Sequence, residues 1–235
     1  MLPKIKHPNF EFVIPSTKKK ESFRPFLVRE EKILLMAKAS EDLSEALRAI
    51  KQIVNNCCMN TTFDVDRLTI FDLEYLFLQI RAISVNNIVS VSYRDNEDQQ
   101  VYDFKIDITQ IQVNFPEKIE NKIKVDDNIG ILMKYPAASL LNEAEIFAKD
   151  QDGFFELVLK CIDKIYDQTD VYDPSNYTIA ELEQFLDECG VETLEKIQKF
   201  MLNVPRLHHE IHYKNSLGND RTIVLSTLSD FFTFR

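Results

Sequence analysis

The chain has 235 residues, of which 45% are hydrophobic and 28% are charged, and its formal net charge is −10. This composition is ordinary for a folded protein and excludes a wholly disordered chain, and no apolar run reaches the roughly 18 residues of a membrane-spanning helix. The excess of acidic residues also disfavours non-specific binding to nucleic acid or to an anionic membrane.

The N-terminal region is expected to be an extended arm followed by a hairpin. Pro3 and Pro8 oppose helix formation within residues 1–9. Apolar residues then alternate from position 10 to Ile14 and stop at Pro15, which predicts a short strand. Residues 22–24 are predicted to form the returning strand.

Three helices are expected next. Glu30 and Glu31 precede an apolar run, and acidic residues are favourable at a helix N-terminus. Apolar residues at helical spacing predict two further helices, over about 42–56 and 70–84.

The middle of the chain is rich in strand patterns separated by polar turns. Such alternation is typical of an antiparallel sheet with one face in water. The predicted strands cover residues 88–93, 101–108, 111–115, 123–125 and 129–133.

Helical patterns return after Pro136. Apolar residues from Phe154 to Ile165 follow a helical stripe, which includes Cys161 as a small core residue. Thr178 and Glu181 form a capping-box pattern. The helix that follows should end at Gly190, a natural residue just beyond a helix C-terminus.

The last helix is expected over about 194–204, ended by Pro205. Residues 207–214 and 221–225 then predict a hairpin. Phe231, Phe232 and Phe234 follow it, and because their exposure would be costly we expect them to dock on this chain or on another one.

These patterns together predict an α+β fold in which antiparallel sheets from the N-terminal, central and C-terminal strands pack with two helical segments. The predicted organisation is one or two compact domains, with the clearest join near Pro136. The segments are an N-terminal arm and hairpin, a helical segment, a β segment, a second helical segment, and a C-terminal hairpin with an aromatic tail, at residues 1–28, 29–86, 87–135, 136–206 and 207–235.

Charge is distributed unevenly along the chain. Residues 1–20 carry five lysines against Glu11, whereas residues 152–195 carry twelve acidic residues against Lys160 and Lys164. The acidic stretch is either a set of solvated helix faces or a docking surface for a basic partner. Salt-dependent binding would favour the second interpretation.

No motif for catalysis or cofactor binding is present. The four glycines stand alone, so the chain contains no glycine-rich phosphate loop, and it has no CxxC, GxSxG or HExxH pattern. We therefore expect no cofactor and no catalytic residue. The N-terminus also lacks the apolar core of a secretory signal, and reduced thiols in a cytoplasmic setting are expected.

One group of residues has the composition of a metal site. His208, Glu210 and His212 would share one face of a strand, and two histidines with a carboxylate can bind zinc or non-haem iron. Residues at i and i+4 of a straight strand, however, lie about 13 Å apart. A polar strand face is therefore the expected interpretation, and a metal-dependent enzyme is the remote alternative.

Several blocks of sequence carry a family resemblance. They are FEFVIPST at residues 10–17, FRPFLVREEKILLMA at 23–37, FDLEYLFLQIRA at 71–82, MKYP at 133–136 and VPRLHH at 204–209. In this order and spacing the blocks resemble the T4-like bacteriophage baseplate hub assembly family, and they span nearly the whole chain.

The resemblance implies a non-enzymatic role in building the tail baseplate of a contractile-tailed phage. Members of the family are described as hub subunits or hub assembly catalysts, and a catalyst in this sense promotes protein association without bond chemistry. Two hypotheses follow: a chaperone-like assembly factor that acts in the host cytoplasm, or a permanent structural subunit of the virion tail baseplate.

The expected partners are other phage baseplate or tail hub proteins, with no nucleic acid and no membrane. The sequence leaves the oligomeric state open. The residues predicted to contact a partner are aromatic or basic and lie near the two ends of the chain, although each could also be a core residue: Phe10, Phe12, Arg24, Phe26, Phe231, Phe232 and Phe234.

Overall fold

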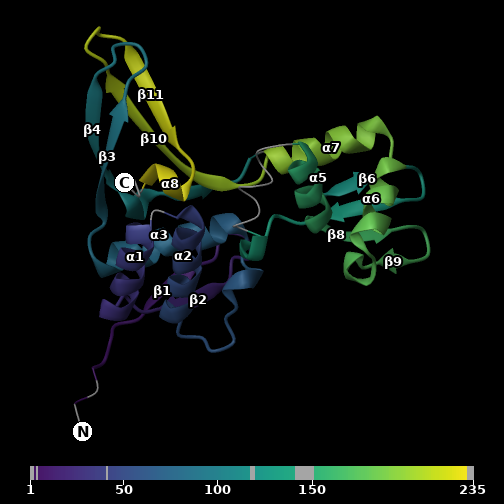
Figure 1. The fold of residues 1–235 in the computed structure, drawn as a ribbon, viewed down its shortest axis with the longest axis horizontal. Coiled ribbons are helices and arrows are strands. Elements are labelled where there is room, and N and C mark those ends of the chain that lie inside the picture. The colour runs from purple at the N-terminus through teal and green to yellow at the C-terminus, as the bar shows by residue number, and fades with distance from the viewer. Residues whose placement is uncertain (1–2, 4, 41, 117–119, 141–150, 232–235) are drawn as a thin grey trace. The chain divides into compact units, whose positions relative to one another are not determined.

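The computed structural model describes residues 3, 5–40, 42–116, 120–140 and 151–231. Contacts within the chain divide it into two compact units, of which unit 1 comprises Met1–Asn114 with Arg206–Arg235 and unit 2 comprises Phe115–Pro205. Both units combine helices with small antiparallel sheets (Figure 1), so the predicted α+β class is confirmed. The units separate after Asn114 and before Arg206 and not near Pro136.

Unit 1 begins with the predicted hairpin, formed by strands β1 (Phe10–Val13) and β2 (Lys20–Phe23). Lys18, at the turn, has a φ of 59°, and its backbone N–H donates to the carbonyl of Ile14. The turn is also joined to a distant helix, because the backbone N–H and the hydroxyl of Ser16 both donate to the buried carboxylate of Asp72.

Three helices follow the hairpin, and their order agrees with the sequence-based prediction. The middle helix packs against both of the others. Asp72 completes a capping box with Thr69 at the start of the third helix, so the same carboxylate caps that helix and holds the hairpin turn. The helices are α1 (Val28–Ser40), α2 (Leu43–Cys57) and α3 (Ile70–Ser84), with a short 3-10 turn, η1 (Val65–Arg67), before α3.

A buried ion pair ties the hairpin to the first two helices. Arg24 and Glu30 are 6% and 0% exposed, and their side chains pair in a two-pronged geometry, with N–O distances of 2.9 and 3.1 Å. Arg24 also donates to the backbone carbonyls of Pro25 and Asn56. One side chain therefore connects the end of β2, the first turn of α1 and the last turn of α2.

Hydrogen bonds keep the buried carboxylate of Glu30 ionised. Burial by itself would raise the pKa of Glu30. Hydrogen bonds from Arg24, from the backbone N–H of Leu27 and from Arg29 outweigh that effect and lower the pKa to about 2. The pair is therefore fully charged at neutral pH.

Two further hairpins complete unit 1. Strands β3 (Ile88–Arg94) and β4 (Val101–Asp107) form the first, and β10 (Arg206–Lys214) and β11 (Asp220–Leu225) form the second, as the sequence predicts. A short 3-10 turn, η2 (Ile108–Gln110), follows β4, and β5 (Gln112–Asn114) pairs with the start of β10. The C-terminal helix α8 (Leu228–Phe231) contacts β3.

The tips of these two hairpins are joined by polar contacts around Asp95. Its carboxylate is buried and accepts hydrogen bonds from the Tyr213 hydroxyl and from Nε of Arg221, at 2.5 and 3.1 Å. Chiefly because of the Tyr213 hydrogen bond, the pKa of Asp95 is lowered. The hairpins therefore extend from the helices of unit 1 as one projection (Figure 1).

The described residues of unit 2 form a four-stranded antiparallel sheet in the order β6-β7-β8-β9 and three helices. The strands are β6 (Lys122–Lys124), β7 (Gly130–Met133), β8 (Ile162–Tyr166) and β9 (Val171–Tyr172). The helices are α5 (Gln151–Lys160), α6 (Ile179–Asp187) and α7 (Val191–Leu202), with short 3-10 turns η3 (Ala138–Leu140) and η4 (Pro174–Asn176). Apolar residues from the sheet and the helices pack together in a buried cluster.

The central strands are antiparallel, as the sequence predicts, but they are distributed over three different sheets. The first two form their own hairpin, β5 joins β10, and β6 and β7 belong to unit 2. The partner strands β8 and β10 lie much later in the chain. Alternation along one strand does not reveal such long-range pairing.

The prediction of a helix over residues 154–165 is wrong for the residues after Lys160. Helix α5 ends at Lys160, and Ile162–Tyr166 form strand β8. The register between β7 and β8 shifts at Leu132 and Met133, and Ile162 and Ile165 are both buried although they are three residues apart. A bulge that puts residues i and i+3 on one face of a strand produces the spacing of a helical stripe.

The capping box at the start of α6 is confirmed, since Thr178 and Glu181 exchange hydrogen bonds with each other's backbone N–H groups. The prediction for Gly190 is wrong. Helix α6 has its C-cap at Glu188, and Gly190 is the N-cap of α7, with an extended backbone at φ −67°. Glycine is also common at an N-cap, so the residue type alone does not distinguish the end of one helix from the start of the next.

Replacing Arg24 with methionine tests the buried pair. The Arg24→Met variant leaves the Glu30 carboxylate buried without its main partner, and breaking such a pair costs about 3–5 kcal/mol. We expect a loss of that size in the free energy of unfolding, measured with urea at pH 7.

Arg29→Met is the matched control, because Arg29 contacts the same Glu30 oxygen at 2.7 Å while its side chain is 64% exposed. Loss of an exposed partner costs less than about 1 kcal/mol. Equal losses in the two variants would contradict the role assigned to Arg24.

Candidate interaction surfaces

The N-terminal residues predicted to bind a partner are partly packed within unit 1. Phe10 is 37% exposed, and Phe12 is half-buried with its ring 5.9 Å from that of Phe23. Phe26 is half-buried against Phe77 of α3, again at 5.9 Å. These three side chains therefore contribute to the fold and also keep some area that a partner could contact.

The other predicted contact residues are buried or undescribed. Arg24 belongs to the buried ion pair, and Phe231 is 2% exposed at the end of α8, docked on this chain. Phe232 and Phe234 lie outside the described residues. Partner contact through this set stays a prediction.

Helix α1 has exposed apolar side chains that are not among the predicted contact residues. Val28, Leu35 and Met36 are all exposed, and Met36 keeps 72% of its surface. The sequence contains a signal for this, because the apolar run from Ile33 to Ala37 is longer than one helix face can bury.

His208, Glu210 and His212 share one strand face, as predicted. Glu210 lies between the histidines, with one oxygen 3.1 Å from Nε2 of His208 and the other 3.3 Å from Nε2 of His212. All three side chains are partly or largely exposed. Among the described residues, no group of three or more histidine, cysteine or acidic side chains is placed to hold a metal ion.

The cysteines are free thiols, and burial makes two of them unreactive. Desolvation raises the pKa of both Cys57 and Cys161 to about 12. It also raises the pKa of Cys58 and Cys189, which are half-buried. Thiolate nucleophiles at neutral pH are therefore not favoured at these positions.

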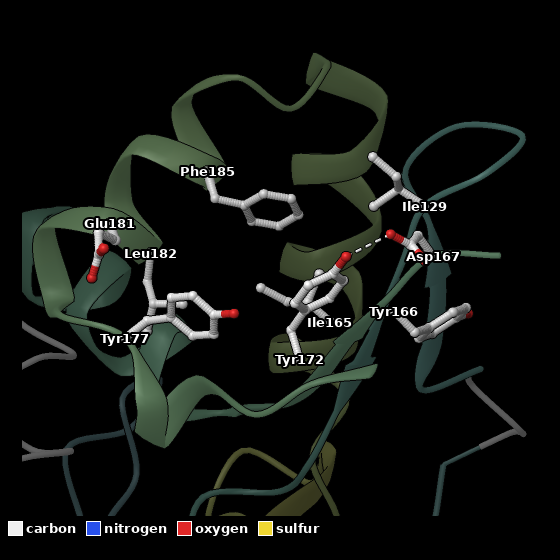
Figure 2. A pocket seen from close by; sticks show the side chains of 9 residues that line it. All are labelled: Ile129, Ile165, Tyr166, Asp167, Tyr172, Tyr177, Glu181, Leu182 and Phe185. Atoms are coloured by element: carbon white, nitrogen blue, oxygen red, sulfur yellow. Dashed lines mark hydrogen bonds between the residues drawn. The ribbon is translucent and has the colours of Figure 1, made fainter. Parts of the chain in front are cut away.

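Unit 2 contains an apolar pocket of about 400 Å³ between the sheet and helix α6. In Figure 2, Phe185 of α6 faces the rings of Tyr172 and Tyr177 across this space. Ile165 and Leu182 are each 8% exposed, so the pocket reaches the edge of the buried core. Its apolar and aromatic lining includes Ile129, Ile165, Tyr172, Tyr177, Leu182 and Phe185.

Tyr166 forms another part of the pocket wall, opposite a glycine of the neighbouring strand. Gly130 pairs with Tyr166 across β7 and β8, and a Cβ atom at Gly130 would lie 2.4 Å from the end of the tyrosine ring. The missing side chain therefore leaves room for the ring.

The pocket has two carboxylates in its lining, Asp167 and Glu181. The Tyr172 hydroxyl donates to Asp167 at 2.7 Å, and this bond, with hydrogen bonds from the following loop, lowers the pKa of Asp167. The same contact raises the pKa of Tyr172 to about 12. Hydrogen bonds from Thr178 lower the pKa of Glu181, so both carboxylates are negatively charged at neutral pH.

The net charge of the chain belongs to unit 2. Unit 1 contains nineteen acidic and nineteen basic residues, and unit 2 contains nineteen acidic and nine basic residues. Unit 1 is therefore formally neutral, and unit 2 carries the whole charge of −10. A charge of this size on one small unit attracts basic partners and repels acidic ones.

The sequence alone does not predict that the residues lining this pocket come together. The chain has eight tyrosines, and three of them, Tyr166, Tyr172 and Tyr177, lie in a span of only twelve residues inside the acidic stretch. This cluster was an available signal, since tyrosine is enriched where proteins bind one another. Phe185 had only the appearance of a helical core residue.

An apolar pocket with an acidic lining, an acidic unit and exposed apolar residues on α1 are features of a protein that binds other proteins. The chain belongs to the T4 bacteriophage base plate protein family, whose model matches residues 7–233. No curated protein and no solved structure matches the chain.

The family assignment makes this chain a phage baseplate protein, with other baseplate proteins as its implied partners. Baseplate proteins are generally structural or assembly proteins and not enzymes. Within the described part of the chain, no helix is long and apolar enough to cross a membrane.

Alkylation tests the burial of the thiols. With a pKa of about 12, only about one in ten thousand of the Cys57 and Cys161 thiols is ionised at pH 8. We expect iodoacetamide to leave both residues unmodified in the folded protein and to modify all four cysteines in urea, as measured by peptide mass spectrometry. Cys58 and Cys189 are the internal comparison, and modification of Cys57 or Cys161 at the same rate in both conditions would refute the assignment.

Proposed function

We propose that this protein is an assembly factor for the phage tail baseplate hub that acts through protein–protein contacts in the host cytoplasm. The observation that carries the baseplate role is the family match, which covers residues 7–233 and so both units of the fold, and the charge distribution is what favours an assembly factor within that role. The role is chaperone-like: the chain brings hub components together and changes no covalent bond.

The charge distribution supports a reversible role. An acidic unit attracts basic surfaces at long range, and contacts between exposed charges raise association rates more than they raise affinity. A partner held in this way is bound quickly and released easily, which an assembly factor requires. Unit 1, which is formally neutral, has exposed apolar residues on α1 for a second kind of contact.

The second candidate is a permanent structural subunit of the baseplate. The family's description, which names the base plate itself, favours this candidate. The two roles use the same kinds of surface and differ in whether the chain remains in the finished particle.

The copy number in purified virions distinguishes the two candidates. We expect quantitative mass spectrometry with isotope-labelled peptides to find this chain absent, or well below the known baseplate subunits measured in the same sample. These subunits are the control for loss during purification. A fixed copy number that matches the symmetry of the baseplate would overturn the assembly-factor proposal and support the structural subunit.

A further inference from the structure

The pocket of unit 2 has the chemistry of a site for one side chain of another protein. Its volume of about 400 Å³ is near the lower end of the roughly 300–1,000 Å³ that is usual for ligand pockets. Aromatic and aliphatic side chains make up most of its lining, and its floor reaches the buried core at Ile165 and Leu182. Such a surface favours an apolar occupant.

The polar groups of the pocket argue against a phosphate or another anionic ligand. No lysine or arginine is among the described residues that line it, and both lining carboxylates are negatively charged. The Tyr172 hydroxyl is already bonded to Asp167. The Tyr177 hydroxyl makes no hydrogen bond within the described part of the chain and remains available to a ligand.

Charge complementarity indicates what surrounds the apolar group. Asp167 and Glu181 lie at the pocket, and unit 2 as a whole carries a charge of −10. A segment with lysine or arginine on both sides of its apolar residue would be attracted to this unit, whereas an acidic segment would be repelled.

We propose that this pocket binds an aliphatic or aromatic side chain, flanked by lysine or arginine residues, from a partner protein. This inference rests on the proposed function, in which the chain works by binding other proteins, and it specifies the partner's chemistry. The apolar side chain enters the space between Phe185, Tyr172 and Tyr177, and the flanking cations lie near Asp167 and Glu181.

Synthetic peptides test the proposal on the full-length chain. The probe is a fluorescein-labelled nine-residue peptide with one leucine between two pairs of lysines and with glycine and serine elsewhere. One control peptide replaces the leucine with serine, and the other replaces the lysines with glutamates. We expect fluorescence anisotropy to show saturable binding of the leucine–lysine peptide, at least ten-fold weaker binding of the serine peptide and no binding of the glutamate peptide.

Paired variants place the binding in the pocket. Glu181→Gln removes one charge but keeps an oxygen that can cap α6, and Glu183→Gln makes the same change on an exposed residue that does not line the pocket. We expect about three-fold weaker peptide binding for the first, the effect of one exposed ion pair, and an unchanged affinity for the second.

Tyr177→Ala removes one aromatic wall of the pocket, and Tyr177 is 41% exposed, so the fold should tolerate the change. We expect roughly ten-fold weaker binding, as for an aromatic contact residue. Ile179→Ala is the control, because Ile179 is exposed at the start of α6, two residues after Tyr177, and lies outside the pocket lining. Urea unfolding of each variant verifies that the fold is retained.

Three results would overturn the inference: no binding of the leucine–lysine peptide, equal binding of the leucine and serine peptides, or equal effects of the pocket and control substitutions. Self-association of the chain that Tyr177→Ala abolishes would also overturn it, because a second copy would then be the occupant. If no peptide binds but baseplate formation still requires the chain and purified virions lack it, this inference fails and the proposed function stands. If the peptide binds as expected but baseplates form normally without the chain, the proposed function fails.

Discussion

The buried pair of Arg24 and Glu30 is the interaction on which unit 1 depends. It joins the end of the N-terminal hairpin to the first turn of α1 and, through the carbonyl of Asn56, to the last turn of α2. Asp72 has a similar role at the other end of the hairpin, where it holds Ser16 and caps α3. Both contacts are made by residues of the sequence blocks that resemble the phage family. The blocks at residues 10–17, 23–37 and 71–82 therefore contain residues that hold unit 1 together. A buried charge is tolerated only where it is fully paired and hydrogen-bonded, so Glu30 needs Arg24 beside it and Asp72 needs its hydrogen-bond donors.

Much of the local structure was predictable, because local patterns determine it. The hairpin of β1 and β2, helices α2 and α3, the capping box of Thr178 and Glu181 and the hairpin of β10 and β11 all follow from spacing or from residue type. Strand β8 was not predictable in this way. Its bulge buries Ile162 and Ile165 together, and the pairing with β7 that creates the bulge is a tertiary contact. The pairing of β5 with β10 could not be predicted for the same reason, since these two strands of unit 1 lie on either side of unit 2 in the chain.

The candidate sites were predictable only in part. The acidic stretch at 152–195 was visible in the sequence as an alternative between a solvated surface and a docking surface. The structure adds that the charge belongs to a unit with an apolar pocket, lined by side chains from β8, β9 and α6. A pocket is formed by packing between elements. The sequence could show that tyrosines are clustered, but not that Tyr172, Tyr177 and Phe185 line one pocket. Exposure likewise depends on tertiary packing. The sequence therefore did not reveal that Arg24 and Phe231, two of the predicted contact residues, are buried.

We propose above all that the chain brings baseplate proteins together, and loss of the chain tests this most directly. The measurement is electron microscopy of lysates from a phage with an early stop codon in this reading frame, with and without the intact protein supplied from a plasmid. The account predicts that complete baseplates and tails are missing without the protein and return when it is supplied. Normal numbers of complete tails in its absence would contradict the account.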